Sequence, residues 1–376
     1  MDASASIREI SVLQVLPALG GGGVERGTLE MTQAIAEAGG TPLVASAGGR
    51  LAESIERAGG QNLLLPLDSK NPWTIWRNAA RLEALIRGAR VRIVHARSRA
   101  PAWSAWLAAR RTGARFVTTY HGAYGDFPGK RQYNAVMARG ERVIAISRFI
   151  ADLLERRHRV APERIRVIHR GVDPALFDPA AVAPERVRAL ARQWRLPTRR
   201  PVVMLPGRLA RWKGQSVLIE ALAGRDAVGV LVGDAGQHES FARELEEAAQ
   251  RQRVDLRIVG HCEDMPAALL LADVVVNASV EPEAFGRVVV EAQAMGRPVI
   301  ATDHGGAVET VEPGSTGWRV APGDAAALGA AVDAALALPA PARADLAARA
   351  RAAVLAHYTV RAMQQKTLAV YRELLG

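Results

Sequence analysis

Short apolar runs alternate along the chain with stretches in which apolar residues recur every three or four positions. The first half contains the runs ISVLQVLPAL, TPLVASA, RIVHARS, RFVTTYHG, ERVIAIS and RIRVIHRGVD. Such a run is typical of a buried strand, and the stretch after it is typical of an amphipathic helix. The alternation therefore predicts repeated βα units on a parallel sheet.

A second series of runs follows a stretch rich in Pro and Ala, residues 174–200, which carries no strand pattern and which we interpret as the connection between domains. The second series is PVVMLPG, AVGVLVGD, VDLRIVG, DVVVNAS, RPVIATD and TGWRVAP, and each run except the last precedes a helical pattern. We expect two Rossmann-like domains, over residues 1–175 and 176–360. Their ligands should bind beyond the carboxyl ends of the strands.

The size and composition fit this organisation. A chain of 376 residues with 49% hydrophobic residues is long enough for two cores. The N-terminus lacks the basic start and the longer apolar core of a signal peptide, and no apolar stretch approaches the roughly 20 residues of a membrane span. One cysteine, Cys262, excludes an intrachain disulfide and fits a reducing compartment. We expect a cytoplasmic protein, soluble or peripheral on a membrane.

The net charge of +11 is unevenly distributed. Residues 1–180 hold 26 Lys and Arg against 16 Asp and Glu, whereas residues 181–376 hold 23 against 22. A basic first half indicates an anionic partner, nucleic acid or a lipid surface, although an Arg-rich composition also arises without any partner. Nucleic-acid binding rests on charge alone, because no aromatic RNP-type motif is present, and we do not expect it.

The segment EPEAFGRVVVEAQAMGRP places Glu283 before a predicted helix, Gly286–Met295, and Glu291 in its second turn. The loop that leads into the helix brings unpaired N–H groups and the positive end of the dipole, which attract phosphate. The two carboxylates should stand roughly 10 Å apart, a distance that suits the hydroxyls at the two ends of a nucleotide diphosphate sugar. The alternative makes Glu291 a solvated helix residue and Glu283 a partner of the dipole.

Two cations follow the first strand of the second half. In LPGRLARWKGQS, Arg208 and Lys213 share one loop at the carboxyl end of that strand. Fixed cations there are able to neutralise a diphosphate leaving group. The order Lys213-Gly214 does not match the Gly-Lys-Ser/Thr of a P-loop, which argues against a Walker-type ATPase.

Glycines and a histidine follow strands of the first half. The loop LGGGGVERG allows the backbone to approach a ligand, and we attribute its glycines to the conformations that only glycine tolerates. Its spacing does not match the Gly-x-Gly-x-x-Gly of a dinucleotide-binding dehydrogenase. His121, in TTYHGAYG, ends a later strand and either faces the ligand or is a structural histidine.

Together these residues resemble the family-four retaining glycosyltransferases of the GT-B fold, over nearly the whole chain. The matching pieces, in order, are the loop Gly20–Gly23 with Glu25, YHGAYG, AISRF, HRGVD, GRLARWKG, VGDAG, VGHCEDMPAALLLADVVVNAS, the Glu283–Glu291 segment and HGGAVETVEPGSTGW. The resemblance implies two sheets that face each other across a cleft. It also implies a last helix, residues 361–376, that joins the N-terminal domain.

The resemblance also implies roles for individual residues. In the C-terminal domain, Glu291 would bind the ribose hydroxyls and Arg208 and Lys213 the diphosphate. Glu283 and the backbone of Ala284, Phe285 and Gly286 would contact the donor sugar, and His261 and Cys262 would lie against the base. From the N-terminal domain, Gly22 and Gly23 would approach the phosphates, and His121 would approach the transferring sugar. Arg170 stands where the family often has Asn, and we expect it near the acceptor or a phosphate. Gly305 and Gly306 either approach the donor or form a turn.

The implied activity is transfer of a hexose-type sugar, from a UDP-sugar by preference, with retention of configuration. The acceptor would be a saccharide or glycolipid such as lipopolysaccharide core or another envelope glycan. A donor phosphate oxygen would receive the acceptor proton, so we assign no protein base, and we expect no metal and no cofactor. The alternatives are a nucleotide-sugar epimerase of the same fold and a non-catalytic nucleotide-sugar-binding protein.

The acceptor would bind the basic N-terminal domain. There, Trp73, Trp76 and Arg77 lie in one helical pattern, and Trp103 and Trp106 in another. Tryptophan beside arginine suits the headgroup layer of an anionic bilayer. We hypothesise a peripheral membrane enzyme, while Trp103 and Trp106 are also compatible with a core helix.

Overall fold

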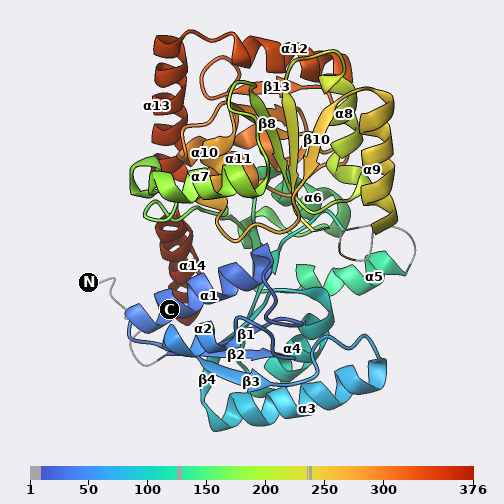
Figure 1. Ribbon diagram of the computed structural model, residues 1–376. Helices are drawn as coiled ribbons and strands as arrows, with labels where there is room; N and C mark the ends of the chain where they lie inside the picture. The colour runs from blue at the N-terminus through green and yellow to red at the C-terminus, as the bar shows by residue number, and fades with distance from the viewer. Residues whose placement is uncertain (1–9, 125–128, 235, 237–238) are drawn as a thin grey trace. The chain divides into compact units, whose positions relative to one another are not determined.

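The computed structural model describes residues 10–124, 129–234, 236 and 239–376, and it divides into two compact units (Figure 1). Unit 1 comprises Met1–Arg170 and Val360–Gly376, and unit 2 comprises Gly171–Thr359. The pattern of apolar runs predicts this division at 175/176 and 360/361. Unit 1 holds 29 Lys and Arg against 15 Asp and Glu, whereas unit 2 holds 20 against 23, so the positive charge belongs to unit 1.

Unit 1 is built on a parallel seven-stranded sheet in the order β3-β2-β1-β4-β5-β6-β7. The strands are β1 (Ser11–Val15), β2 (Thr41–Ser46), β3 (Gln61–Leu64), β4 (Val91–Ala96), β5 (Arg115–Tyr120), β6 (Arg142–Ala145) and β7 (Ile165–Val167). Six of them coincide with the apolar runs. The pattern misses β3 because this short edge strand is only partly buried and its first residues, Gln61 and Asn62, are polar.

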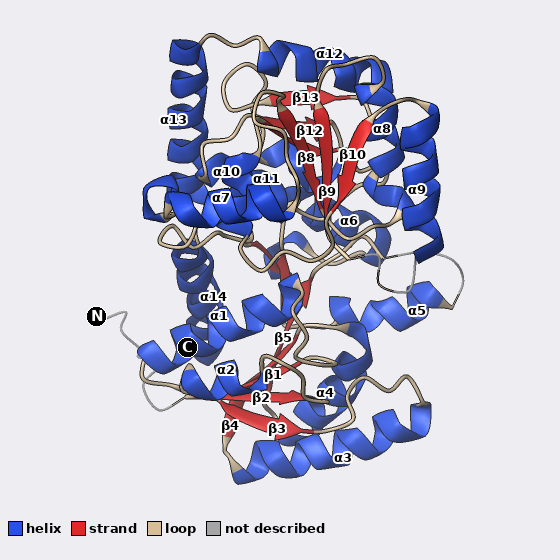
Figure 2. Ribbon diagram, viewed as in Figure 1, coloured by secondary structure: helices blue, strands red, loops and turns tan. Residues whose placement is uncertain are grey.

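Helices cover both faces of this sheet (Figure 2). They are α1 (Gly23–Glu37), α2 (Ala52–Arg57), α3 (Pro72–Gly88), α4 (Arg99–Thr112), α5 (Lys130–Asn134), α6 (Arg148–His158) and α14 (Val360–Leu375), with the 3₁₀ turn η1 (Ala135–Ala138) after α5. Apolar side chains of α1 and α14, such as Met31 and Leu368, pack on Val12, Ile93 and Val117 of the sheet. Burial of this apolar surface stabilises the unit.

The last helix, α14, is held within unit 1 by polar contacts at both of its ends. Gln364 Nε2 donates to the Glu30 carbonyl at 2.7 Å. Near the C-terminus, Glu373 forms ion pairs with Arg142, at 2.7 Å, and with Arg166. Between these contacts Tyr371 is fully buried, and burial raises the pKa of its hydroxyl to about 12.

Unit 2 is built on a parallel six-stranded sheet in the order β10-β9-β8-β11-β12-β13. The strands are β8 (Val202–Pro206), β9 (Val228–Val232), β10 (Asp255–Ile258), β11 (Val274–Asn277), β12 (Val299–Thr302) and β13 (Trp318–Val320), and all six coincide with the second series of apolar runs. The helices are α7 (Pro184–Gln193), α8 (Gln215–Leu222), α9 (Glu239–Arg251), α10 (Met265–Leu271), α11 (Arg287–Ala294), α12 (Ala325–Leu336) and α13 (Ala340–His357).

Two expectations about this half are wrong in detail. Residues 174–200 are not a bare connection, because they contain α7, which packs in unit 2 through the Arg186–Asp264 ion pair at 2.6 Å. The last strand, β13, is followed by α12 and α13, whose Ala-rich sequences give little contrast between an apolar and a polar face. Helix α12 begins where the side chain of Asp324 accepts from the Ala327 N–H, which is a standard N-cap.

In both parallel sheets the order in which the chain adds strands reverses between two central strands. The order runs outward from β1 towards β3 on one side and from β4 towards β7 on the other, and unit 2 repeats this between β8 and β11. Such a switch point opens a crevice at the carboxyl ends of the two strands, and ligands of open α/β sheets bind there. The loops after β1, β4, β8 and β11 are therefore where function is to be sought.

No single helix of the described residues is long and apolar enough to cross a bilayer; only α12 with α13 reaches the necessary length and composition, as a pair bent by 110°.

Candidate functional site

The loops after β8 and β11 of unit 2 are joined by an ion pair. Lys213, in the 3₁₀ turn η4 (Arg211–Lys213), contacts Glu283 with 2.7 Å between Nζ and Oε1, and Ser279 donates its hydroxyl to the same carboxylate. The Val280 N–H donates to the Trp212 carbonyl at 2.8 Å. Gly214 has φ +72°, and a Cβ there would collide with the Ala278 carbonyl, so only glycine allows the two loops to approach so closely. The structure thus brings Lys213 and Glu283 together at the switch point.

The loop that carries Glu283 is braced from its other side by Gly305 and Gly306, in the 3₁₀ turn η5 (Gly305–Glu309). The Gly306 N–H donates to the Glu283 carbonyl at 2.8 Å. A Cβ at Gly305, where φ is +63°, would lie 2.5 Å from that carbonyl oxygen. These glycines make room for the backbone of residues 283–285, so their role is to position the loop.

Helix α11 begins directly after this loop. Its N-cap is Gly286, in the left-handed conformation with φ +76°, and glycine has no side chain that could cap the first turn. The first N–H groups therefore remain able to bind an anion, helped by the helix dipole. Phe285 is buried against Tyr358, with 5.8 Å between the ring centroids, whereas Ala284 is only partly buried. The backbone at Ala284 and Gly286 lies at the positive end of the helix.

Glu291 lies within α11 and is buried, with 8% of its surface exposed. It is therefore not the solvated helix residue of the alternative interpretation. Its carboxylate pairs at 3.1 Å with Arg287, which is not among the residues predicted for the site. Arg287 sits in the first turn, where a cation opposes the helix dipole, and among the residues that the structure describes its buried Nε has no hydrogen-bond partner. The signal for Arg287 was its spacing of four residues from Glu291.

The other predicted donor residues of unit 2 are not drawn into this cluster. The Arg208 side chain is exposed and forms no ion pair within the described residues, and its carbonyl accepts from Gln215 Nε2 at 3.0 Å. His261 and Cys262 lie in the loop between β10 and α10, two strands away from β8. His261 is exposed, and burial raises the pKa of the Cys262 thiol, which keeps it protonated and unreactive.

In unit 1, the glycine loop follows β1 and leads into α1, whose N-cap is Gly22 without a side-chain cap. Gly20, Gly21, Gly22 and Gly23 all have ordinary φ angles, so the expectation that they supply glycine-only conformations is wrong. A Cβ at Gly22 would meet only the Glu25 side chain, 2.7 Å from its Oε2, and that flexible carboxylate is able to move aside. The glycine-only conformation is at Gly49, with φ +141°, where a Cβ would collide with the Leu19 backbone.

Buried basic groups gather at the same edge of the sheet. Arg97, directly after β4, is 2% exposed; its Nε donates to Gln14 Oε1 at 2.8 Å, and its Nη2 has no partner within the described residues. Arg170, 5% exposed, donates to the Gly23 carbonyl at the start of α1 and so fixes the glycine loop. This contact gives the Arg that departs from the family pattern a definite structural role.

Two histidines complete this group. His95 contacts the Tyr371 hydroxyl through Nδ1, at 2.6 Å, and the Thr119 hydroxyl through Nε2, at 2.7 Å. His121 lies directly after β5, and its buried Nε2 has no partner within the described residues. Burial lowers the pKa of both imidazoles well below 6.5. The charge of Arg97 lowers the pKa of His95 further, and the charges of Arg170 and Arg97 lower the pKa of His121 further. His121 is therefore neutral at pH 7 and able to exchange a hydrogen bond with a hydroxyl group.

The described residues contain no group of three or more His, Cys, Asp or Glu side chains arranged to hold a metal ion.

Two family models match the chain. Residues 21–176 match Glycosyltransferase Family 4, and residues 187–353 match Glycosyl transferases group 1. Among curated proteins, the D-inositol 3-phosphate glycosyltransferase of Salinispora arenicola is 34% identical over 57% of this chain and 54% of its own length. The enzyme of the same name from Mycobacterium marinum is 30% identical over 72% of this chain and 61% of its own length. The chain thus spans about half the length of the curated relatives it matches.

Solved structures are similar over the whole chain. A glycosyltransferase from Rickettsia africae is 36% identical, with a TM-score of 0.91, over 98% of this chain and 99% of its own. Anabaena Alr3699/HepE, solved in complex with UDP and glucose, is 21% identical, with a TM-score of 0.85, over 97% of this chain and 100% of its own. WaaG, a glycosyltransferase involved in lipopolysaccharide biosynthesis, is 17% identical with a TM-score of 0.74, over 96% of this chain and 99% of its own. The last two similarities concern the fold.

Proposed function

The chain belongs to the group 1 glycosyltransferases with a family 4 N-terminal domain, and from this premise we propose that it moves a hexose-type sugar from a nucleotide diphosphate sugar to a saccharide or glycolipid acceptor. The observation that carries the proposal is the Lys213–Glu283 ion pair beside the uncapped start of α11, at the switch point of unit 2. An ammonium group and unpaired N–H groups together stabilise the charge that develops on a departing diphosphate.

The donor proposal is a UDP-sugar. It is supported by the fold shared with Alr3699/HepE, whose solved complexes contain UDP, UDP-glucose or glucose. Glu291 would accept hydrogen bonds from the ribose hydroxyls, because a buried carboxylate is a strong acceptor and Arg287 holds it in place. Arg208 would swing its exposed side chain onto the diphosphate, and His261 and Cys262 would lie against the base.

The proposed reaction retains the configuration of the sugar and needs no metal ion and no cofactor. In this proposal Glu283, fixed by Lys213 and Ser279, binds the sugar hydroxyls and does not act as a nucleophile. A neutral His121 would bind the transferring sugar, and Gly22 and Gly23 would let the backbone approach the phosphates. The proton of the acceptor hydroxyl would pass to a phosphate oxygen of the donor. The cations and the helix dipole would stabilise the leaving group in place of a metal.

The test combines binding and turnover. We expect UDP to bind the wild-type protein in isothermal titration calorimetry, and Glu291→Ala to weaken this binding by about tenfold or more, because the buried carboxylate loses its hydrogen bonds to ribose. Glu247→Ala, a substitution on the exposed surface of α9, is the control. No heat with any common nucleotide sugar would contradict the donor proposal, and binding without transfer to a panel of saccharide and glycolipid acceptors would identify a binding protein instead.

The acceptor proposal includes an anionic membrane surface. Trp73 and Trp76 of α3 are 64% and 51% exposed and stack with 5.2 Å between their centroids. Arg77 and Arg81 lie on the same exposed face of the helix. By contrast, Trp103 donates its Nε1–H to the Tyr133 carbonyl at 3.1 Å, and Trp106 lies under Arg139, so both serve the packing of α4. The membrane-facing pair would be Trp73 and Trp76 alone, and an envelope-glycan acceptor would lie in that surface.

Vesicle sedimentation tests this surface. We expect the wild-type protein to sediment at low salt with vesicles that contain phosphatidylglycerol and not with pure phosphatidylcholine vesicles. Replacement of both Trp73 and Trp76 by alanine should lower the bound fraction by about tenfold or more, because two interfacial aromatic anchors are lost. Leu176→Ala, at a 48% exposed position of unit 2, is the matched control for loss of an exposed apolar side chain. Equal sedimentation of the wild type and the double variant would contradict the proposal.

A further inference from the structure

Two bonds join the loop after β12 of unit 2 to the loop after β11. His304 Nε2 lies 2.8 Å from the Ser279 carbonyl oxygen, and the Gly306 N–H donates to the Glu283 carbonyl at 2.8 Å. The strands β11 and β12 are neighbours in the sheet, so their carboxyl ends bring these loops side by side. The loop after β12 therefore holds the segment 279–283 at both of its ends.

The direction of the histidine bond follows from its partner. A carbonyl oxygen is an acceptor, so Nε2 of His304 carries a proton and donates, in the neutral imidazole as in the imidazolium. His304 is the N-cap of η5, a position where Ser, Thr, Asp or Asn usually caps the turn with its side chain. The His304 side chain extends to the loop after β11 instead. Its orientation is therefore set by a contact between two loops and not by the turn that it begins.

Ser279 links this contact to the carboxylate of Glu283. It is 1% exposed; its carbonyl accepts from His304, and its hydroxyl donates to Glu283 Oε1. The same carboxylate oxygen lies 2.7 Å from Lys213 Nζ. Because a hydrogen bond weakens steeply away from its preferred geometry, the hydroxyl holds the carboxylate only while the backbone of Ser279 stays in place. The bond from His304 fixes that backbone.

We propose that His304 is a positioning residue, which acts through Ser279 to hold the Glu283 carboxylate where it binds the donor sugar. The sugar-binding role of Glu283 rests on the proposed function. Groups that bind a reacting substrate have to be held within about 0.5 Å of the productive geometry. Residues 279–286 belong to no helix or strand, so neighbouring loops have to supply this support. Lys213 supplies it from the loop after β8, and His304 supplies it from the loop after β12.

Hydrogen exchange of the full chain tests the support of the loop without any sugar. We expect His304→Leu to raise the exchange rates of peptides that cover residues 279–286 by about tenfold, because leucine is of similar size but has no N–H donor. His304→Gln should leave these rates unchanged, since the amide nitrogen of glutamine reaches about as far as Nε2. The amide of asparagine is one methylene shorter, so His304→Asn should behave like His304→Leu.

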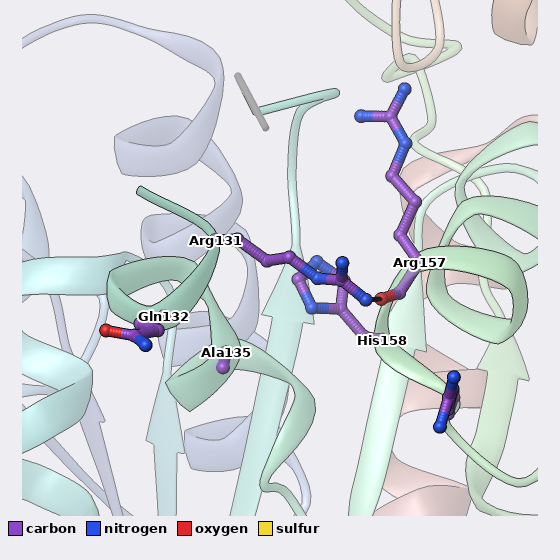
Figure 3. Close-up of a pocket in the computed structure, with 6 residues that line it drawn as sticks. Arg131, Gln132, Ala135, Arg157 and His158 are labelled. Carbon is purple, nitrogen blue, oxygen red and sulfur yellow. Dashed lines mark hydrogen bonds between the residues drawn. The ribbon is translucent and has the colours of Figure 1, made fainter. Parts of the chain in front are cut away.

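Arg131→Ala is the control for loss of a bond from a side chain to a backbone carbonyl. In unit 1, Arg131 Nη2 donates from α5 to the Arg157 carbonyl at the end of α6, at 2.9 Å (Figure 3). We expect this variant to leave the exchange of residues 279–286 unchanged, because they belong to unit 2. An equal increase in Arg131→Ala and His304→Leu would mean that this exchange follows general stability, which contradicts a local role of His304.

A double-mutant cycle tests whether His304 acts through Ser279. Ser279→Ala removes the hydroxyl and leaves the carbonyl, so it breaks the connection to Glu283 while His304 keeps its partner. We expect His304→Leu and Ser279→Ala each to lower kcat/KM for transfer from UDP-glucose by about tenfold, and the double variant to be no slower than the slower single variant. The affinity for UDP should stay within about twofold, because Glu283 is proposed to contact the sugar and not the nucleotide.

The outcomes separate a positioning role from a merely structural one. Unchanged exchange in His304→Leu, or losses of kcat/KM that add up in the double variant, would overturn the proposal. Rescue of both exchange and rate by His304→Gln, and not by His304→Asn, supports it. Absence of UDP binding or of transfer in the wild-type protein would count against the proposed function, whereas the exchange of residues 279–286 still decides whether His304 supports the loop. Failure of one proposal is therefore distinguishable from failure of the other.

Discussion

Replacement of Lys213 by alanine is expected to lower kcat for glycosyl transfer by about 10²–10³-fold, the usual loss when one preorganised electrostatic contact to a developing charge is removed. The Lys213 side chain is 17% exposed, so its ammonium acts in an environment with little water to screen it. Because the charge on the diphosphate grows as the sugar leaves, the contact strengthens in the transition state and kcat falls more than donor affinity. Initial rates over a range of donor concentrations separate the two constants.

Lys213→Ala also removes the partner of a carboxylate that is 12% exposed, so we expect it to change the stability of the protein as well as the rate. Among the described residues the Glu283 carboxylate would keep only the Ser279 hydroxyl, and an uncompensated buried carboxylate lowers the free energy of unfolding by several kcal/mol. The melting temperature should therefore be measured beside the rate. Lys213→Ala combined with Glu283→Gln removes the stranded charge and should recover stability without recovering kcat. Recovery of both would show that Lys213 serves only to hold the loop.

Arg211→Ala is the control for charge. Arg211 shares the η4 turn with Lys213, but its side chain is 72% exposed and pairs with Glu244 at 2.6 Å on the surface. Arg211→Ala removes one positive charge from the same turn, as Lys213→Ala does. The stability should hardly change, because an exposed ion pair contributes little to it. We expect its kcat to stay within about twofold of the wild type. An equal loss of rate in both variants would mean that the net charge of the loop, and not the position of Lys213, drives the reaction.

The sequence predicts the strands correctly wherever both faces of the strand are buried. All five residues of β8 and of β9 are buried, so their apolar runs are continuous and easily recognised. The edge strand β3 has no such run, and α12 has too many alanines for its apolar face to stand out. Helix α7 was missed because prolines before and after it suggested an irregular segment, although Pro184 stands at the first position of the helix, where proline is favoured.

The sequence predicts those residues of the candidate site that stand at the end of a strand or in the loop after it. Lys213, Glu283 and His121 were identified because each follows a strand directly or in the next loop. Arg97 also follows a strand, but its sequence, HARSR, lies among many arginines and carries no spacing that sets it apart. The brace formed by Gly305 and Gly306 depends on the loop of residues 283–285, which lies far earlier in the chain, and sequence spacing alone does not reveal which backbone a glycine will meet. Contacts between loops of different strands are therefore what the structure adds.

Unit 1 is expected to lose stability as the pH falls from 6.5 to 5, because it keeps two histidines neutral. The pKa values of His95 and His121 lie well below 6.5 in the folded chain, whereas the unfolded chain binds protons at about 6.5. Below that pH the unfolded state holds more protons, so folding is disfavoured by up to about 1.4 kcal/mol per pH unit for each histidine. The stability is fully present above pH 6.5 and is lost on acidification, until the folded pKa is reached.

Hydrogen exchange of the peptides that cover β4 and β5 measures the free energy of unfolding of unit 1 separately from unit 2, once the rates are corrected for pH. His95→Gln should remove about half of the slope between pH 6.5 and 5, because glutamine does not titrate and retains donors for Tyr371 and Thr119. His261→Gln, at an exposed position of unit 2, should leave the slope unchanged. The ion pairs of Glu373 with Arg166 and Arg142 lower the pKa of its carboxyl group below 4.5. Protonation of Glu373 therefore destabilises unit 1 only at more acidic pH, outside the range in which the histidines titrate. Parallel profiles for the wild type and His95→Gln would mean that water reaches these imidazoles and protonates them in the folded state, and the neutral His121 of the proposed reaction would then lose its physical basis.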